Sequence, residues 1–403
     1  MHNVFRGFVV LIILLSSYVT GDTPVHFEDI NLKRAVENAI GSENPTVADM
    51  ENLKKLDASG YGITDLTGLE TAINLTNLNL NDNKLRDIPE FIGNFRGLYF
   101  LNARNNQIGT IPDSIGNLTK LVRLDLHNNG ITDVPDTLRN CTKLCMIYFS
   151  SNFLTDVPES LQYLNELVYL NVNNNYIEDI PTFLWDLEHF SSLFIENNRI
   201  SSIPEGISKL KHLSHFSVAH NNIDELPEEL FDSPELMLFY CNSNSLTSIS
   251  PNIYKLSSSL TDLSIGDNPL ECVPAEIGDL LSLKYVFMWN VNGCDVSQSA
   301  GRLKDLKVLQ LSGNNFPVDF HCKLVPIIVD NNPYADIFTD VNEHPMLWDC
   351  VAGLEDLALF SSHWLNVTYV NCQYNEWCEG ADINHDDIVN LIDYSLLVDY
   401  WNE

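Results

Sequence analysis

A twelve-residue stretch near the C-terminus carries oxygen donors at regular spacing. Positions 1, 3, 5, 9 and 12 have carboxylate or amide side chains, and position 7 can offer a backbone carbonyl. Ca²⁺ prefers about six to eight oxygen ligands arranged in this way. The spacing predicts a calcium site, and the alternative is an acidic helix start that binds no metal. The expected ligands are Asp382, Asn384, Asp386, Ile388 through its carbonyl, Asn390 and Asp393.

A helical pattern follows this loop and also occurs 37 residues earlier, over 354–364 and 391–401. The duplicated loop and helix resembles a type I dockerin of the planctomycete-type variant, over residues 340–403. The resemblance implies a small all-α module that binds calcium and docks onto a cohesin-like partner. Pro345 and Leu347 stand where the first half needs donors, so one calcium site is expected. The competing interpretation is that the module only caps the C-terminus.

Upstream, an asparagine recurs every 23 residues in the frame L-x-x-L-x-L-x-x-N-x-L-x-x-I-P, as in residues 75–89. A fixed period of this length indicates stacked units that share one elongated core. The pattern resembles a leucine-rich repeat and predicts an α/β solenoid of about twelve repeats over residues 53–316. We expect each asparagine to hydrogen-bond backbone groups where the coil turns. The recurring residues are Asn83, Asn106, Asn129, Asn152, Asn175, Asn198, Asn221 and Asn244, with Asn268 and Asn314 nearly in step.

Within each repeat, residues two, four and six places after the opening leucine should face solvent, because strand side chains alternate. These positions are rich in aromatic residues, and a run of them on adjacent strands suggests a surface for a protein or polysaccharide ligand. The alternative is that aromatic residues simply favour strands. The candidates are Phe100, Arg104, Arg123, Tyr148, Tyr169, Phe194, His215 and Tyr240, with His127, Tyr285, Phe287 and Trp289 at equivalent positions.

The segments on either side of the repeats have their own patterns. Residues 1–21 have the basic start, short apolar core and small residues of a secretory signal. Residues 22–52 form an amphipathic helical cap, with Asp29 or Asn31 as a helix start and a capping box at Thr46 to Asp49. This segment resembles the helical N-cap of bacterial surface leucine-rich repeat proteins. Residues 317–339 are interpreted as a C-terminal cap and linker.

The formal net charge of −33 excludes whole classes of partner. Nucleic acids require Lys and Arg to neutralise phosphates, and anionic membranes attract basic segments. After the signal, no segment has 18 uninterrupted apolar residues, so we expect no transmembrane segment and a secreted or cell-surface protein. Nine cysteines are an odd number, and Cys272 with Cys294 is a disulfide candidate because both fall near one coil position in successive repeats. Cys241 replaces an inward aliphatic residue and should be a buried thiol.

The sequence contains no recognisable catalytic constellation, and its histidines have no nucleophile at a defined spacing. We therefore expect a non-catalytic binding protein, not an enzyme. Two other roles remain open: an inhibitor of a secreted enzyme, and a non-catalytic subunit of a polysaccharide-degrading complex. The calcium module would attach the repeats to a cell-surface or scaffold partner.

Overall fold

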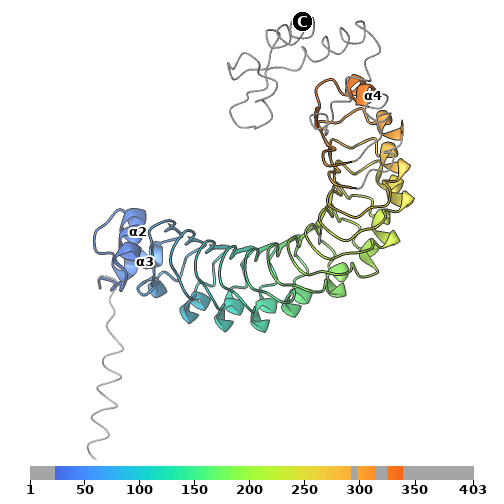
Figure 1. Cartoon of the computed structure of the whole chain (residues 1–403). Coiled ribbons are helices and arrows are strands. Elements are labelled where there is room, and N and C mark those ends of the chain that lie inside the picture. The colour runs from blue at the N-terminus through green and yellow to red at the C-terminus, as the bar shows by residue number, and fades with distance from the viewer. Residues whose placement is uncertain (1–22, 292–297, 315–324, 339–403) are drawn as a thin grey trace, which may run out of the picture. The chain divides into compact units, whose positions relative to one another are not determined.

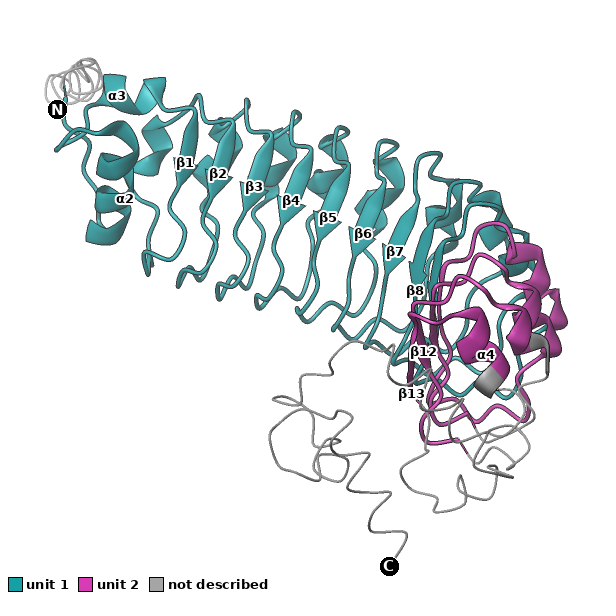
Figure 2. Ribbon diagram, turned by 90° about the horizontal axis from the view of Figure 1, so that it is seen from above, with its two compact units in different colours: residues 1–250 teal, residues 251–403 magenta. Residues whose placement is uncertain are grey.

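The computed structural model describes residues 23–291, 298–314 and 325–338 (Figure 1). They form two compact units, the first ending at Ser250 and the second beginning at Pro251 (Figure 2). Both units are built from repeats of a three-residue parallel strand and a short helical segment. The predicted signal, Cys294 and the calcium module lie outside the described residues.

Two α-helices precede the first strand, α2 (Ile30–Ile40) and α3 (Val47–Asn52). Asp29 caps α2 by accepting hydrogen bonds from the backbone N–H groups of residues 31 and 32, and Gly41 ends the helix in a left-handed conformation. The capping box expected at Thr46 and Asp49 is present at the start of α3. Helix α2 contacts the first strand and α3 contacts the first 3-10 helix, so both lie at the N-terminal end of the repeats.

Nine parallel strands follow in unit 1, each paired with its sequence neighbours. The middle residue of each strand is buried. Leu78 and Leu101, for example, are both buried and pair in register on neighbouring strands. Within this unit the strands line the inner side and the helical segments the outer side (Figure 1). The strands are β1 (Lys55–Asp57), β2 (Asn77–Asn79), β3 (Phe100–Asn102), β4 (Arg123–Asp125), β5 (Met146–Tyr148), β6 (Tyr169–Asn171), β7 (Ser192–Phe194), β8 (His215–Ser217) and β9 (Leu238–Tyr240).

The outer segments of unit 1 are 3-10 helices, shorter than the α-helices that an α/β class suggests. A proline stands directly before most of them, as Pro112 does, where its fixed φ suits a helix start and its missing N–H is not needed. Each helix buries an aliphatic residue such as Ile115 in the core. They are η1 (Leu69–Thr71), η2 (Glu90–Asn94), η3 (Asp113–Asn117), η4 (Asp136–Asn140), η5 (Glu159–Tyr163), η6 (Thr182–Asp186), η7 (Ile207–Lys209) and η8 (Glu228–Asp232).

The recurring asparagines hold successive repeats together. The Asn129 amide donates to the carbonyls of Ala103 and Leu126, at 3.0 and 3.1 Å, and its Oδ1 accepts from the N–H of Ile108 at 3.0 Å. The same pattern recurs at Asn152 in the next repeat. Each side chain thus satisfies backbone groups of two repeats at a buried position, which confirms the expected role of the period.

The residue before each recurring asparagine has a left-handed backbone, with φ of 57° at Asp82 and 54° at Asn105. Asn and Asp adopt this conformation more readily than most residues, so their frequency there has a local cause. The side chains also join across repeats: Asn105 donates to Asp82 at 2.7 Å, and Asn128 donates to Asn105 at 3.0 Å. Ser151 continues this row with φ of 56° but without an amide.

Unit 2 continues the repeat pattern with four parallel strands paired in order. The last strand, together with the helix before it, falls inside the segment predicted to be a cap and linker, so the parallel strands extend past residue 316. Asn332 anchors this turn by donating to the carbonyl of Leu303 at 2.7 Å. The elements are β10 (Asp262–Ser264), β11 (Tyr285–Phe287), β12 (Val308–Gln310), α4 (Val325–Asn331) and β13 (Asp336–Phe338), with η9 (Pro251–Leu256), η10 (Ala275–Asp279) and η11 (Gln298–Arg302).

Candidate binding surface

The first and third residues of each strand in unit 1 point away from the core. Strands β3 and β6 show the pattern of partly exposed, buried, partly exposed residues. This alternation confirms the predicted orientation of the side chains. We call the outward side chains of β1–β9, with the residue two places after each strand, the concave face.

Four rings on this face form a continuous series, which we call the aromatic ladder: Tyr148, Tyr169, Phe194 and His215. Their successive centroids are 4.8, 5.3 and 6.4 Å apart, with interplanar angles of 34°, 36° and 36°. The rings alternate between the third and first positions of their strands, so the ladder runs in a zigzag across β5 to β8. Aromatic pairs at these separations stabilise one another beyond their buried area.

Small or flexible side chains make room for the zigzag. Ser192 lies in register between Tyr169 and His215, and Ser217 lies opposite Phe194. A large ring at each of these positions would crowd the rings beside it. The small residues in register with the rings therefore leave space in which neighbouring rings can lie against one another.

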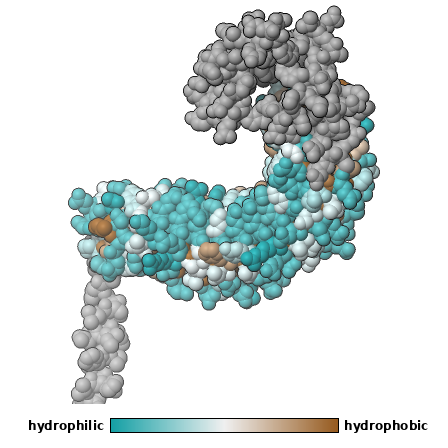
Figure 3. Space-filling view, in the orientation of Figure 1, coloured by the Kyte–Doolittle hydropathy of each residue, from teal (hydrophilic) through white to brown (hydrophobic). Residues whose placement is uncertain are grey.

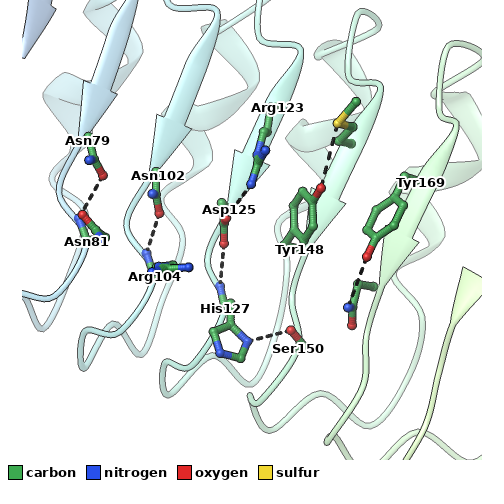
Figure 4. A network of polar contacts seen from close by, with 12 residues as sticks. Asn79, Asn81, Asn102, Arg104, Arg123, Asp125, His127, Tyr148, Ser150 and Tyr169 are labelled. Carbon is green, nitrogen blue, oxygen red and sulfur yellow. Dashed lines mark hydrogen bonds and ion pairs between the residues drawn. The ribbon is translucent and has the colours of Figure 1, made fainter. Parts of the chain in front are cut away.

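Arg123 extends the ladder toward the N-terminus (Figure 4). Its guanidinium carbon lies 4.5 Å from the centroid of Tyr148 and 5.5 Å from that of Phe100, within cation–π range of both rings. Its Nη2 pairs with the Asp125 carboxylate at 3.1 Å, and Asp125 is 4% exposed. The planar, always-charged arginine fits between two rings and beside a buried carboxylate, which a lysine could not do in the same way.

The polar side of the concave face is shaped by hydrogen bonds at the strand exits (Figure 4). Asn102 accepts from the N–H of Arg104 at 3.1 Å, and Asp125 accepts from the N–H of His127 at 3.3 Å. The ring of His127 lies 2.7 Å from the Ser150 hydroxyl. These contacts fix the backbone where it leaves each strand and hold the polar side chains beside the ladder.

The concave face of unit 1 differs from the whole chain in its charge. Its cationic residues are equal in number to its anionic ones, whereas the chain has a net charge of −33. Burial raises the pKa of the Tyr169 hydroxyl, partly offset by a hydrogen bond from Asn171, so this hydroxyl stays neutral at physiological pH. The face is therefore aromatic and nearly neutral on an acidic protein. The charged residues are Lys55, Arg104 and Arg123 against Asp57, Asp125 and Glu196.

Comparison with known proteins identifies the architecture. A family model described as a leucine-rich repeat region matches residues 37–180. An internalin from Listeria monocytogenes is similar in structure, with a TM-score of 0.68, 23% identity, and coverage of 79% of this chain and 93% of that one. A leucine-rich repeat protein of Leptospira interrogans has a TM-score of 0.55 and 23% identity, covering 77% and 98%. No curated protein matches the chain.

This is the leucine-rich repeat fold. The plant peptide hormone receptor RGFR1, solved in complex with RGF2, shares it with a TM-score of 0.56 and 25% identity, over 63% of this chain and 43% of that one. Among the described residues, no helix is long and apolar enough to cross a membrane. On the face that Figure 3 shows, the described residues are mostly hydrophilic, with a few small hydrophobic patches.

The leucine-rich repeat frame brings most of the candidate residues together. Six of the eight join in the ladder and its extension through Arg123. Arg104 is exposed at a strand exit, and Tyr240 lies opposite Ser217 one strand beyond His215. Asp125 is not among the residues predicted from the sequence, although its position in the frame marks it as outward-facing. Binding at these residues stays a prediction.

The described residues test some of the cysteine predictions, but they do not include the predicted calcium loop. Cys241 is a buried thiol, as the sequence predicted, and burial raises its pKa. Cys141 is also a buried free thiol, with its pKa raised by burial to about 12. Cys272 is disulfide-bonded, but Cys294 lies outside the described residues, so their pairing stays a prediction. The described part of the chain holds no group of three or more metal-ligating side chains, and the predicted calcium loop lies outside it.

Proposed function

We propose that the concave face of unit 1 is a non-catalytic surface that binds a protein or peptide partner, with the aromatic ladder at its centre. The close contact of four rings and Arg123 in one continuous series supports this proposal most strongly. Rings held by their neighbours lose little conformational entropy when a partner binds. Such a rigid aromatic cluster is the usual centre of a protein interface.

The geometry of the ladder favours a protein over a polysaccharide at this site. A sugar ring stacks on an open aromatic face, but the rings of Tyr148 and Tyr169 lie against each other, tilted by 34° with their centroids 4.8 Å apart. Arg123 occupies a further face of Tyr148. The ladder therefore offers ring edges and hydroxyl groups to a partner. Edges and hydroxyls suit the apolar side chains and backbone carbonyls of a polypeptide.

Exposed residues at or just before the strands of unit 1 include types that are common in protein interfaces. Met146 is 38% exposed at the start of β5, and Tyr99 and Met237, which precede β3 and β9, are 54% and 46% exposed. Aromatic residues, Met and Arg are enriched in interfaces, whereas Lys and Glu are depleted. The plant receptor solved in complex with RGF2 supports the use of this fold for such a purpose.

Two sets of alanine substitutions test the proposal in the full-length protein. The first set changes Tyr148, Tyr169 and Phe194, and the matched control changes three exposed aromatic residues away from the ladder, Phe153, Tyr163 and Tyr176. Proteins retained from the native culture supernatant would be identified by mass spectrometry and their affinities measured with purified partner. We expect the ladder set to weaken binding of a saturable protein partner at least about a hundredfold, and the control set by less than about threefold. Equal binding by both sets contradicts the proposal.

The identity of the captured partner separates the two roles consistent with this surface. A secreted enzyme whose activity falls on binding identifies an inhibitor, whereas a cell-surface protein identifies an adhesive or receptor role. Both roles fit the expectation of a secreted or cell-surface protein, which the apolar stretch at 8–15 supports. N-terminal sequencing of exported protein tests it: a mature chain starting near Asp22 agrees, and retention of residues 1–21 contradicts it.

We also propose that residues 340–403 bind one Ca²⁺ and tether the repeats to a cohesin-like partner. The ligand spacing from Asp382 to Asp393 supports this, because an empty loop with so many carboxylates repels itself. Calcium should raise the thermal stability of the full chain by linkage, and the double substitution D382A and D393A should abolish that effect. Calcium-dependent capture of a surface protein supports the tether, whereas calcium binding without capture leaves only a capping role. Unchanged calcium response in the double variant contradicts the assigned ligands.

A further inference from the structure

Unit 2 contains an aromatic side chain held in a different way from those of the ladder. Trp289 lies two residues after the end of β11, on the outward side, and its ring covers Gly266 of the preceding repeat. A Cβ atom placed on Gly266 would approach the six-membered part of the indole to 2.4–2.7 Å, so the ring rests directly on the glycine backbone. Only glycine allows this close approach.

Hydrogen bonds fix the orientation of this ring. The indole Nε1 donates to Asp267 at 2.6 Å, and the Asn290 amide donates to the other carboxylate oxygen at 2.8 Å. Asp267 follows Gly266 directly, so one short segment both supports the ring and holds its edge. Phe287 meets Trp289 edge-on, with an interplanar angle of 77° and centroids 6.3 Å apart. One indole face therefore rests on the backbone, and no ring among the described residues is stacked on the other.

The surroundings of the outer face are small and polar. Ser312 occupies the equivalent position in the next repeat, and Gln310 at the end of β12 donates to the Ser312 hydroxyl at 2.5 Å. The Asp267 carboxylate lies at the ring's edge. The result is a flat, fixed apolar surface bordered by carboxylate, amide and hydroxyl groups.

We propose that Trp289 is the platform of a glycan-binding site, in which one pyranose ring of an oligosaccharide stacks on the outer face of the indole. A pyranose has C–H groups on its face, which the negative face of an aromatic ring attracts, and hydroxyl groups around its edge. The polar groups beside Trp289 are suited to hydrogen-bond those hydroxyls. The rings of the ladder in unit 1 instead lie against one another in series, so the two surfaces offer different chemistry. The proposal does not depend on the function proposed for unit 1.

Calorimetric titration of the full-length protein with cellohexaose, mannohexaose and chitohexaose tests this site. We expect at least one hexasaccharide to bind with a dissociation constant of about 1 mM or tighter. W289A should weaken that binding at least about tenfold. G266A keeps the tryptophan but should weaken binding similarly, because the added methyl group lifts the ring off its support. The backbone conformation at Gly266 can be adopted by alanine, because its φ is not positive. The added methyl group therefore acts on the indole ring and not on the backbone.

Two controls make the result specific. G109A adds a methyl group where nothing lies within 4 Å, so it should bind the glycan as the wild type does. The triple alanine variant of the ladder should also bind it normally, which separates this site from the one in unit 1. Circular dichroism and thermal unfolding verify that each variant is folded, and W289A decides the outcome if G266A is not. The proposal is overturned if none of the three hexasaccharides binds, or if W289A binds as tightly as the wild type.

Discussion

Arg123 joins two aromatic rings and a buried carboxylate on the proposed binding surface. Its guanidinium lies over Tyr148 and Phe100, and it pairs with a carboxylate that is 4% exposed. A buried carboxylate without its partner is costly, because the lost solvation is no longer offset. The arginine thus supports both the ladder and the strand beneath it.

We predict that R123M lowers the free energy of unfolding by about 2 kcal/mol, since Asp125 is left buried without its cation. Adding D125N to R123M should recover about half of the loss, because the neutral amide costs less to bury and still accepts from the His127 N–H. Urea denaturation followed by circular dichroism measures both variants. R104M, at an exposed arginine two residues after β3, is the control and should change stability by less than about 0.5 kcal/mol. If D125N gives no recovery, the ion pair is not the source of the loss.

A second residue-scale prediction concerns the left-handed position before the recurring asparagines. Ser151 has φ of 56°, and the preceding repeat places Asn128 beside it. S151N should raise the free energy of unfolding by about 1 kcal/mol, because asparagine tolerates this conformation better and its amide can donate to Asn128. S151A is the control, since it adds no amide and lacks the tolerance of asparagine for this conformation. Equal urea midpoints for S151N and S151A would contradict this account.

Much of the residue-scale picture was available from the sequence. The 23-residue period assigned the buried leucines, the hydrogen-bonding asparagines and the outward direction of Tyr148 and Phe194. The period did not predict that the rings lie against one another. That contact depends on whether a small residue lies in register with each ring on the next strand. Ser192 and Ser217 decide this, and their effect appears only once the register is known. Nor did the sequence predict that Trp289 lies flat on Gly266.

At the scale of elements, the junction between the N-terminal helices and the first repeat depends on one carboxylate. One oxygen of Asp29 caps α2, and the other accepts from the backbone and hydroxyl of Thr64 at 2.7 and 2.9 Å. Burial alone would raise the pKa of Asp29, but these hydrogen bonds outweigh it and lower the pKa below 3.8. The ionised form is therefore the one that joins the two elements.

D29N should destabilise the junction between α2 and the first repeat. The amide oxygen can replace only one of the two carboxylate oxygens, and the NH₂ group, which is a donor, then meets the donors that the other oxygen had accepted from. A lowered pKa means that the contribution of Asp29 is complete above its ordinary value of 3.8 and is lost as the pH falls through the lower folded value. The stability difference between wild type and D29N should be about 1 to 2 kcal/mol at neutral pH and shrink in that acidic range. E51Q, at an exposed residue of α3, should show no such trend. A difference that is constant with pH contradicts the role of ionisation.

Some of the helices and strands could be predicted from the sequence, and others could not. The capping box at Thr46 and the position of each strand follow from short-range patterns, so the sequence contains them. The outer segments are 3-10 helices because only about five residues separate each proline from the next turn, which leaves too little length for a stable α-helix. Strand β13 was not predicted, because its segment lacks the leucine frame and forms a strand by pairing with β12.

At the scale of the whole molecule, the chain combines a strongly acidic composition with a concave face in unit 1 whose charges balance. Repulsion between like-charged copies keeps such a protein soluble and discourages non-specific contact with other acidic proteins. We therefore expect a partner of the concave face to be selected by the shape and aromatic character of the ladder. The central claim is that this face, and not the outer side of the unit, makes the specific contact.

Site-specific photocrosslinking tests this claim most directly. A benzophenone amino acid would replace Met146, which is 38% exposed in register with Tyr169, or Tyr163, which is 50% exposed on the outer helix η5. The full-length variants would be irradiated with native culture supernatant, with and without excess unlabelled wild-type protein. We expect a covalent product with one protein from position 146 that the competitor abolishes, and none from position 163. A competed product from position 163 alone would contradict the central claim.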